Sequence, residues 1–174
     1  EPAEEELETV VDYVRLLEEA GSNAVYLMAT ARYDQEQFLA YGRACADALD
    51  GRVPLIANVG DFDHDYAVEL KKAGFTGIYH AIRLGEGEFT RLPVQQRWDT
   101  IHAAQEAGLL IGTCVEPVGP EHSLEEIAEK TIMTREMGAR FSGAMRRTPI
   151  PTSELAVHGA VTYARMATIV AAVS

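Results

Sequence analysis

The stretch ELKKAGFTGIYHAIR (residues 69–83) decides the fold. It joins the charged end of a helix, an Ala-Gly pair and an apolar run of the kind that forms a strand buried on both faces. The same order occurs around Gly21 and Gly108, and around Gly138 with Met137 in place of the alanine; each of these glycines precedes another apolar run. Glycine ends a helix at such a position because it adopts a positive φ without steric cost. The chain is therefore expected to alternate helices with parallel strands.

Working outward from this stretch, five apolar runs are predicted to be strands: residues 23–29, 53–59, 77–83, 109–117 and 141–147. The segments between them carry apolar residues at the i, i+3, i+4 spacing of a helix with one buried face. The first helix, for example, carries Leu7, Val10, Val11, Val14 and Leu17 on that face. Ser123 and Glu126 form a capping-box pattern that predicts the start of a later helix.

Two architectures contain such a chain: a doubly wound sheet, or part of a TIM-type (β/α) barrel. The chain opens on a predicted helix with no strand before it and closes inside an apolar helix, residues 163–173. A complete barrel needs eight strands and about 250 residues. We therefore expect residues 1–174 to be a single α/β domain, a partial barrel of about five parallel strands whose first strand and C-terminal part are missing.

The composition excludes several classes of protein. Lys and Arg number 15 and Asp and Glu 27, so the net charge of −12 disfavours nucleic acid and anionic membranes as partners. No run of 18 apolar residues and no signal-peptide pattern is present, so neither a membrane span nor secretion is expected. Two cysteines cannot build a disulfide framework, which favours a cytoplasmic protein.

In a barrel the active site lies at the carboxyl ends of the strands, and those positions are rich in Arg, Glu and His here. They hold no lysine, because Lys71, Lys72 and Lys130 all fall on predicted helices. A Schiff-base aldolase is therefore excluded.

Three of these residues, His80, Glu116 and His122, could together bind a metal, so a metal-dependent hydrolase or lyase is one alternative. The other interpretation makes His80 a hydrogen-bonded pocket residue and His122 a residue that merely precedes the helix cap at Ser123. A non-catalytic α/β binding module is a further alternative. Gly85-Glu86-Gly87 is not a phosphate loop, since its glutamate would repel phosphate.

Arg97 lies early in a predicted helix, residues 94–106, that follows a strand and a loop. A guanidinium there suits bidentate capture of a carboxylate, although a solvated surface arginine fits the pattern too. Glu86 and Glu88 could act as an acid and a base or lie in solvent. Cys45 and Cys114 are expected to pack in the core rather than to act as nucleophiles.

Several stretches, in unbroken order, resemble the biotin synthase-like group of radical S-adenosylmethionine (SAM) enzymes. They are residues 69–89, residues 95–123 (QQRWDTIHAAQEAGLLIGTCVEPVGPEHS), the turn RRTPIP at 146–151 and the helix YARMATIVAAV at 163–173. Within this group, YHAIRLGEG and CVEPVGPEH most resemble enzymes of iron-guanylylpyridinol cofactor biosynthesis. Methylornithine synthases and FeFe-hydrogenase maturases are other relatives.

The resemblance implies a 4Fe–4S cluster held by three cysteines, which binds SAM and cleaves it reductively to a 5′-deoxyadenosyl radical. It further implies a role in cofactor or vitamin biosynthesis, a small-molecule substrate, a reductant such as flavodoxin or ferredoxin, and a possible homodimer. This chain holds only Cys45 and Cys114, neither at the position of the cluster loop. We therefore expect a fragment that is inactive alone and whose cluster ligands lie outside it.

The resemblance also assigns roles to individual residues. Arg97 matches the arginine that holds the methionine carboxylate of SAM. The remaining SAM contacts would be His80 and Arg83 near the ribose, with Glu86 as a substitute, Met28, Ala29 and Thr30 at the methionine amino group, and Val118 and Gly119 near the adenine. Substrate contacts would come from Met145, Arg146 and Cys114.

Overall fold

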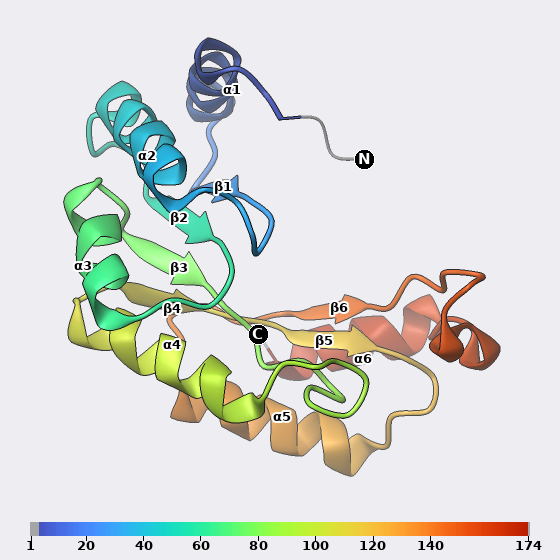
Figure 1. Cartoon of the computed structure of the whole chain (residues 1–174). Helices are drawn as coiled ribbons and strands as arrows, with labels where there is room; N and C mark the ends of the chain where they lie inside the picture. Colours follow the sequence, from blue (N-terminus) through green and yellow to red (C-terminus); the bar gives the residue numbers. More distant parts are fainter. Residues whose placement is uncertain (1–3, 174) are drawn as a thin grey trace. The chain divides into compact units, whose positions relative to one another are not determined.

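The computed structural model describes residues 4–173, which divide into two compact units (Figure 1). Unit 1 comprises Glu1–Tyr79 and Asp99–Leu110, and unit 2 comprises His80–Trp98 and Ile111–Ser174. Within residues 4–173, no helix is long and apolar enough to cross a membrane.

Unit 1 contains a parallel sheet with the strand order β1-β2-β3-β4. The first strands pair in register, with Val25 opposite Leu55 and Ile56 opposite Gly77. The backbone amide of Leu110, the first residue of β4, donates to the carbonyl of Thr76 at 3.1 Å. The strands are β1 (Val25–Met28), β2 (Leu55–Asn58), β3 (Gly77–Tyr79) and β4 (Leu110–Gly112).

Two helices of unit 1 begin at side-chain caps, and Gly21, Gly74 and Gly108, which the sequence marks as helix ends, all have positive φ values. Asp34 accepts from the amide of Gln37 at 2.8 Å, and Asp63 accepts from the amide of Tyr66 at 3.0 Å. The glycine that follows α3 has a φ of 95°, which a residue with a side chain rarely adopts. The helices are α1 (Leu7–Glu19), α2 (Gln35–Leu49), α3 (His64–Lys72) and the larger part of α4 (Val94–Glu106).

The core of unit 1 is built on close packing between α2 and the segment after α3. The rings of Phe38 and Phe75 stack with centroids 5.4 Å apart, and a Cβ at Gly42 would lie 2.3 Å from the Phe75 ring. The predicted buried face of α1 is only partly correct. Val14 is 3% exposed, whereas Leu17 is 44% exposed. Periodicity identifies the apolar face of a helix but not how much partner surface covers it.

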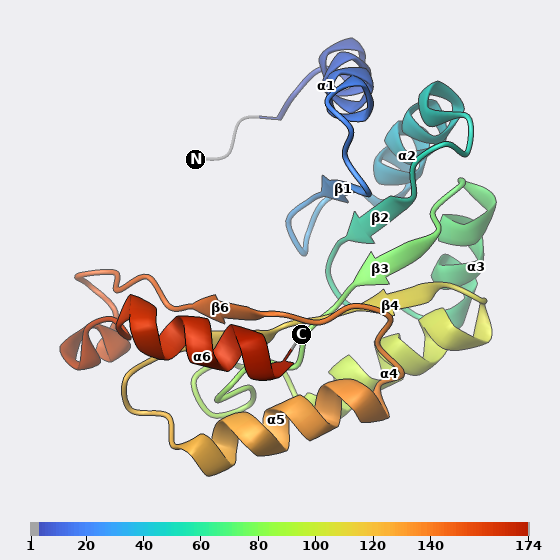
Figure 2. The same ribbon diagram turned by 180° about the vertical axis from the view of Figure 1, so that it is seen from behind.

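Unit 2 is built on a parallel pair of strands, β5 (Val115–Val118) and β6 (Ala144–Arg146), with α5 (Leu124–Glu136) and α6 (Tyr163–Val173) packed against it. Figure 2 shows α6 alongside β6. A short 3₁₀ helix, Glu154–His158, precedes α6. The core of this unit consists of Leu84, Val115, Val118, Ile127, Val161, Met166 and Ile169. The capping box of Ser123 and Glu126 opens α5 as predicted.

The prediction of one strand over residues 109–117 is wrong, because this segment forms two strands, β4 and β5. The amide of Thr113 donates to the carbonyl of Phe141, and the amide of Val115 donates to that of Gly143. On its other side, the amides of His80 and Leu84 donate to the carbonyls of Gly112 and Glu116. The segment is thus hydrogen-bonded on both sides, and only its regular strand geometry is interrupted, at Thr113 and Cys114. Residues 4–173 therefore contain six short strands in place of the five expected. In the segment predicted as the last strand, only Ala144–Arg146 is regular strand, and Phe141 makes an isolated bridge to Gly112.

Candidate functional site

The loop that follows β3 in unit 2 is organised around the carboxylate of Glu86. Its side chain is 1% exposed and accepts from the amide of Arg83 at 3.2 Å and from the hydroxyl of Thr90. Gly85 and Gly87 on either side have φ values of 76° and 82°, which fold the loop back over the carboxylate. Glu86 is therefore a buried group, whereas Glu88 is exposed.

Two arginines lie close to this carboxylate. Arg97 Nε lies 3.6 Å and Arg83 Nη1 lies 3.8 Å from Glu86 Oε2. Arg83 Nε also lies 3.5 Å from Glu116 Oε1 on β5, so Arg83 lies between two carboxylates. Burial lowers the pKa of Lys130 on α5, and the negative charge of Glu86 partly offsets this effect.

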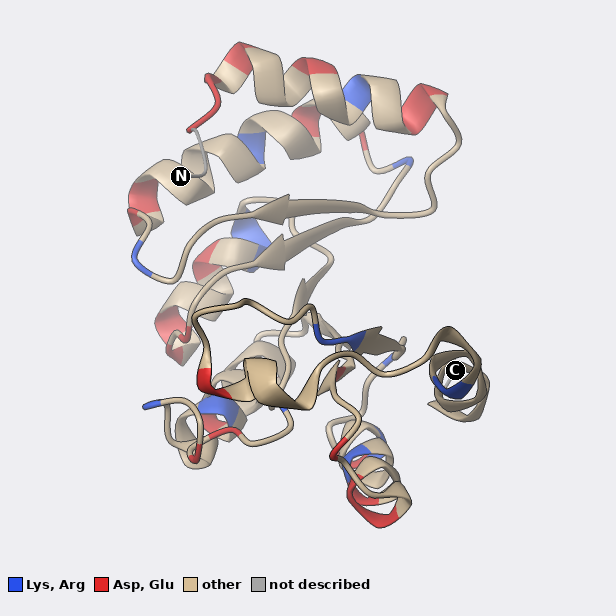
Figure 3. Ribbon diagram, turned by 90° about the vertical axis from the view of Figure 1, so that its right-hand side faces the viewer, with Lys and Arg blue, Asp and Glu red and all other residues tan. Residues whose placement is uncertain are grey.

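These arginines lie in a chain whose net charge is −12. Figure 3 shows Asp and Glu along helices such as α1 and α5. A guanidinium is suited to an anionic group such as a carboxylate, because Arg offers it two parallel hydrogen bonds.

His80 and Arg97 are both buried in this cluster, with 3% and 7% of their surface exposed. Arg97 Nη1 lies 3.4 Å from His80 Nε2. A guanidinium has only donors, so Nε2 accepts and the ring proton resides on Nδ1. Of the two arginines in this cluster, Arg83 is the more accessible to a dissolved ligand, with 43% of its side chain exposed against 8% for Arg97.

Val118 is the last residue of β5 and Gly119 is the first residue after it, and both are buried. The amide of Gly119 donates to Nδ1 of His122 at 2.9 Å. His122 is thus a hydrogen-bonded residue just before the cap of α5, and Glu116 faces Arg83. Among residues 4–173, no three His, Cys, Asp or Glu side chains are placed to hold a metal ion. The alternative of a metal site at His80, Glu116 and His122 is therefore not supported.

The residues assigned to substrate contact differ from one another in exposure and in the groups that they contact. Met145 on β6 is 50% exposed, whereas Arg146 stacks on the ring of Tyr163 with 4.4 Å between its Cζ and the ring centroid. Cys114 is 6% exposed. Cys45 on α2 is fully buried, and burial raises the pKa of its thiol to about 11. Two buried thiols do not fit a cluster that needs three thiolates.

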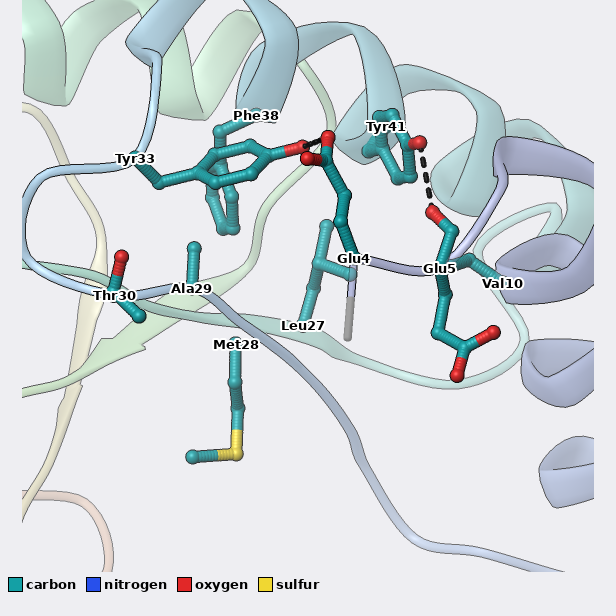
Figure 4. Close-up of a pocket in the computed structure, with 10 residues that line it drawn as sticks. All are labelled: Glu4, Glu5, Val10, Leu27, Met28, Ala29, Thr30, Tyr33, Phe38 and Tyr41. Atoms are coloured by element: carbon teal, nitrogen blue, oxygen red, sulfur yellow. Dashed lines mark hydrogen bonds between the residues drawn. The ribbon is translucent and has the colours of Figure 1, made fainter. Parts of the chain in front are cut away.

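In unit 1, Met28, Ala29 and Thr30 line a pocket of about 530 Å³ at the end of β1 (Figure 4). The Tyr33 hydroxyl donates to the carboxylate of Glu4 at 2.8 Å. Burial, together with this carboxylate, raises the pKa of Tyr33 to about 12. The pocket is otherwise largely apolar, and it contains no cation among its lining residues.

Sequence reasoning did not identify Thr90, Lys130 and Tyr33 as parts of these sites. Thr90 and Glu86 are four residues apart, a spacing that gives no signal outside a helix. Lys130 reaches the cluster from α5, and Tyr33 meets a carboxylate 29 residues away. Only tertiary contacts join them.

No family model and no curated protein matches the chain. Among solved structures, methylornithine synthase has a TM-score of 0.80 at 14% identity, with 98% of this chain covered. The FeFe-hydrogenase maturase HydG from Carboxydothermus hydrogenoformans has a TM-score of 0.65 at 19% identity, with 84% covered. Dihydrodipicolinate synthase from Agrobacterium tumefaciens has a TM-score of 0.56 at 21% identity, with 88% covered.

The chain spans only part of each of these proteins: 53% of methylornithine synthase, 38% of HydG and 53% of dihydrodipicolinate synthase. At such low identities the likeness concerns the fold alone. The chain has a mixed α/β fold of parallel strands and flanking helices, and in fold it corresponds to part of TIM-type barrels such as those of methylornithine synthase and HydG.

Proposed function

We propose that this chain is part of a radical SAM enzyme of the biotin synthase-like group, and that unit 2 binds the anionic end of SAM. The observation that carries the proposal is the cluster at the ends of β3 and β5, where Arg97 and Arg83 lie 3.6 and 3.8 Å from the buried carboxylate of Glu86 and Arg83 keeps 43% of its side chain exposed. Parallel α/β proteins bind ligands at this edge of the sheet. The likeness in fold to methylornithine synthase and HydG supports the proposal.

In this proposal Arg97 and Arg83 act together on the methionine carboxylate of SAM. Arg83 is half-exposed and can turn from Glu116 to the ligand, while Arg97 provides buried positive charge behind it. His80 accepts a hydrogen bond from one nitrogen of Arg97, and the carboxylate of Glu86 attracts both guanidinium groups. We also propose, from the resemblance alone, that the substrate is contacted by Met145, Arg146 and Cys114. The methionine amino group of SAM would be contacted by Ala29 and Thr30.

The cluster ligands would come from residues other than the 174 printed here, since Cys45 and Cys114 do not fit the role. We propose a small-molecule substrate in cofactor or vitamin biosynthesis, a flavodoxin-like or ferredoxin-like reductant and a cytoplasmic location. A longer protein with a Cys-rich cluster motif, loaded anaerobically with iron and sulfide, should give an absorption spectrum that SAM perturbs. A spectrum unchanged by SAM would contradict the family assignment.

The binding proposal is tested on the present chain by titration with SAM, followed by NMR. We expect Arg83→Gln and Arg97→Lys to weaken SAM binding about tenfold, equivalent to one lost charge-assisted hydrogen bond. Arg15→Gln is the control, because Arg15 lies on α1 with 58% of its side chain exposed. Decarboxylated SAM, which lacks the carboxylate, should bind the unmodified chain about tenfold more weakly than SAM. Equal binding of both ligands would overturn the proposal.

A further inference from the structure

The loop that follows β5, residues 118–122, is held by hydrogen bonds that close it on itself and tie it to α6. The amide of Gly119 donates to His122 Nδ1 at 2.9 Å. From α6, Arg165 donates to the carbonyl of Pro120 at 3.0 Å and to the carbonyl of His122. A loop with this many polar anchors has one defined backbone conformation.

Arg147, directly after β6, holds the same loop through both its backbone and its side chain. Its amide donates to the carbonyl of Val118 at 2.8 Å. Its guanidinium binds the two carboxylate oxygens of Glu121, with Nη2–Oε2 at 2.9 Å. Arg147 is 8% exposed, whereas 25% of the Glu121 side chain is exposed, so the pair is buried on the arginine side and reaches solvent on the carboxylate side. The hydrogen bond from Arg147 lowers the pKa of Glu121 to about 2.

Gly119 fits this arrangement because it has no side chain. A Cβ at this position would lie 2.3 Å from Glu121 Oε2 and 2.6 Å from Arg147 Nη2. Both distances are far below contact distance, so the ion pair lies directly against the backbone of Gly119. Any side chain there would push the pair away from the loop.

We propose that the Arg147–Glu121 pair is a clamp that positions loop 118–122 for the nucleoside end of the ligand. This inference rests on the proposed function, together with the resemblance, which implies that Val118 and Gly119 lie near the adenine of SAM. The side chain of Val118 packs in the core of unit 2, so its contact with a ligand comes from the backbone that the clamp holds. Arg147 is therefore a positioning residue.

The clamp can be loosened in two independent ways. Gly119→Ala displaces the pair by volume and leaves both charges in place, while Arg147→Lys keeps the charge and removes the bidentate geometry. Gly143→Ala is the matched control, since a Cβ at Gly143 would meet no atom within 4 Å and its φ is not positive. Hydrogen exchange of the Gly119 amide reports whether the loop has loosened, and thermal unfolding reports whether each variant is folded.

Binding is measured by NMR titration with three probes: SAM, adenosine alone and methionine alone. We expect both clamp variants to weaken binding of SAM and adenosine about tenfold and to leave methionine binding within about twofold. Gly143→Ala should match the unmodified chain with all three probes. A merely structural role would lower binding of methionine and adenosine alike.

The outcomes separate the clamp from the function on which it rests. The unmodified chain could bind SAM and methionine while the clamp variants keep their affinity for adenosine. That result would overturn the positioning role of the Arg147–Glu121 pair and leave the proposed function intact. If all variants lose affinity for methionine as much as for adenosine, the positioning role is likewise overturned. If the unmodified chain binds none of the probes, the proposed function fails and the positioning role fails with it.

Discussion

Two loops of unit 2 bury a charged group in contrasting ways. The loop after β3 surrounds the anion Glu86, whose ion pairs with Arg97 and Arg83 are long, at 3.6 and 3.8 Å. The loop after β5 lies against the cation Arg147, whose pair with Glu121 is bidentate and includes a contact of 2.9 Å.

The difference in geometry indicates a difference in task. Long pairs around Glu86 leave Arg83 with 43% of its side chain exposed, so this arginine can exchange a protein carboxylate for a ligand carboxylate. The bidentate pair has both carboxylate oxygens occupied and rigidifies its loop. The long ion pairs of the first loop leave an arginine able to bind a ligand, whereas the bidentate pair of the second loop restrains the conformation of that loop.

The largest effect is expected from Glu86→Ala, which removes the anion at the centre of the first loop. It leaves Arg97 buried without this counter-charge and removes the acceptor of the Arg83 amide and the Thr90 hydroxyl. We expect a loss of about 3 kcal/mol in the free energy of unfolding, measured by urea denaturation. Glu88→Ala, an exposed change in the same loop, should cost under about 0.5 kcal/mol. Equal losses would show that Glu86 does not organise the loop.

The next effect concerns acid stability and the second loop. The pKa of Glu121 is lowered from its ordinary 4.5 to about 2 by Arg147. A lowered carboxyl pKa contributes stability that is fully present above pH 4.5 and is lost as the pH falls through 2. Because 25% of the Glu121 side chain is exposed, solvent screens the pair, and urea unfolding between pH 5 and 2 should show a loss of only about 1.5 kcal/mol that Glu121→Gln does not share. Parallel pH profiles for the two proteins would mean that the clamp is open in solution.

A smaller effect is expected where the second loop joins α5. Ser123→Ala removes the hydroxyl that accepts from the amide of Glu126 at 3.1 Å, half of the capping box. The expected cost is about 1 kcal/mol, seen as a lower thermal midpoint. Ser123→Thr, which keeps the hydroxyl, should recover most of it. If alanine is as stable as threonine at this position, Arg165 and Arg147 alone fix the loop.

The smallest effect on stability is expected from Arg83→Gln. Its ion pairs with Glu86 and Glu116 are long and partly open to solvent, so their loss should cost under about 1 kcal/mol in urea denaturation. The same variant should lose affinity for SAM, as proposed above. A large loss of stability with unchanged binding would reverse the contrast drawn between the two loops.

Local signals predicted much of the fold. The helices Val94–Glu106 and Tyr163–Val173 have the predicted bounds, and the capping box at Ser123 is present. Cys45 and Cys114 are buried, and the three lysines lie on helices, both as expected. These features depend on spacing and on residues a few positions apart, which are visible in the chain itself.

The errors concern features that local sequence does not determine. Residues 109–117 form one apolar run, yet the regular strand is interrupted at Thr113 and Cys114 although hydrogen bonds continue on both sides of the segment. An apolar run shows that a strand is buried but not where its regular pairing is interrupted. The exposure of Leu17 is a similar case, since a helix has an apolar face whether or not another element covers it.

The sequence by itself therefore determined the alternation of helices and parallel strands, the ends of the helices and the absence of a lysine from the strands. The tertiary structure alone decided that Arg83 faces Glu116, that Lys130 reaches Glu86 and that Arg147 closes on Glu121. The physical reason is distance along the chain. Helix caps and periodicity act within a few residues, whereas these charges lie 26 or more positions apart and meet only when the strands and helices that carry them have packed.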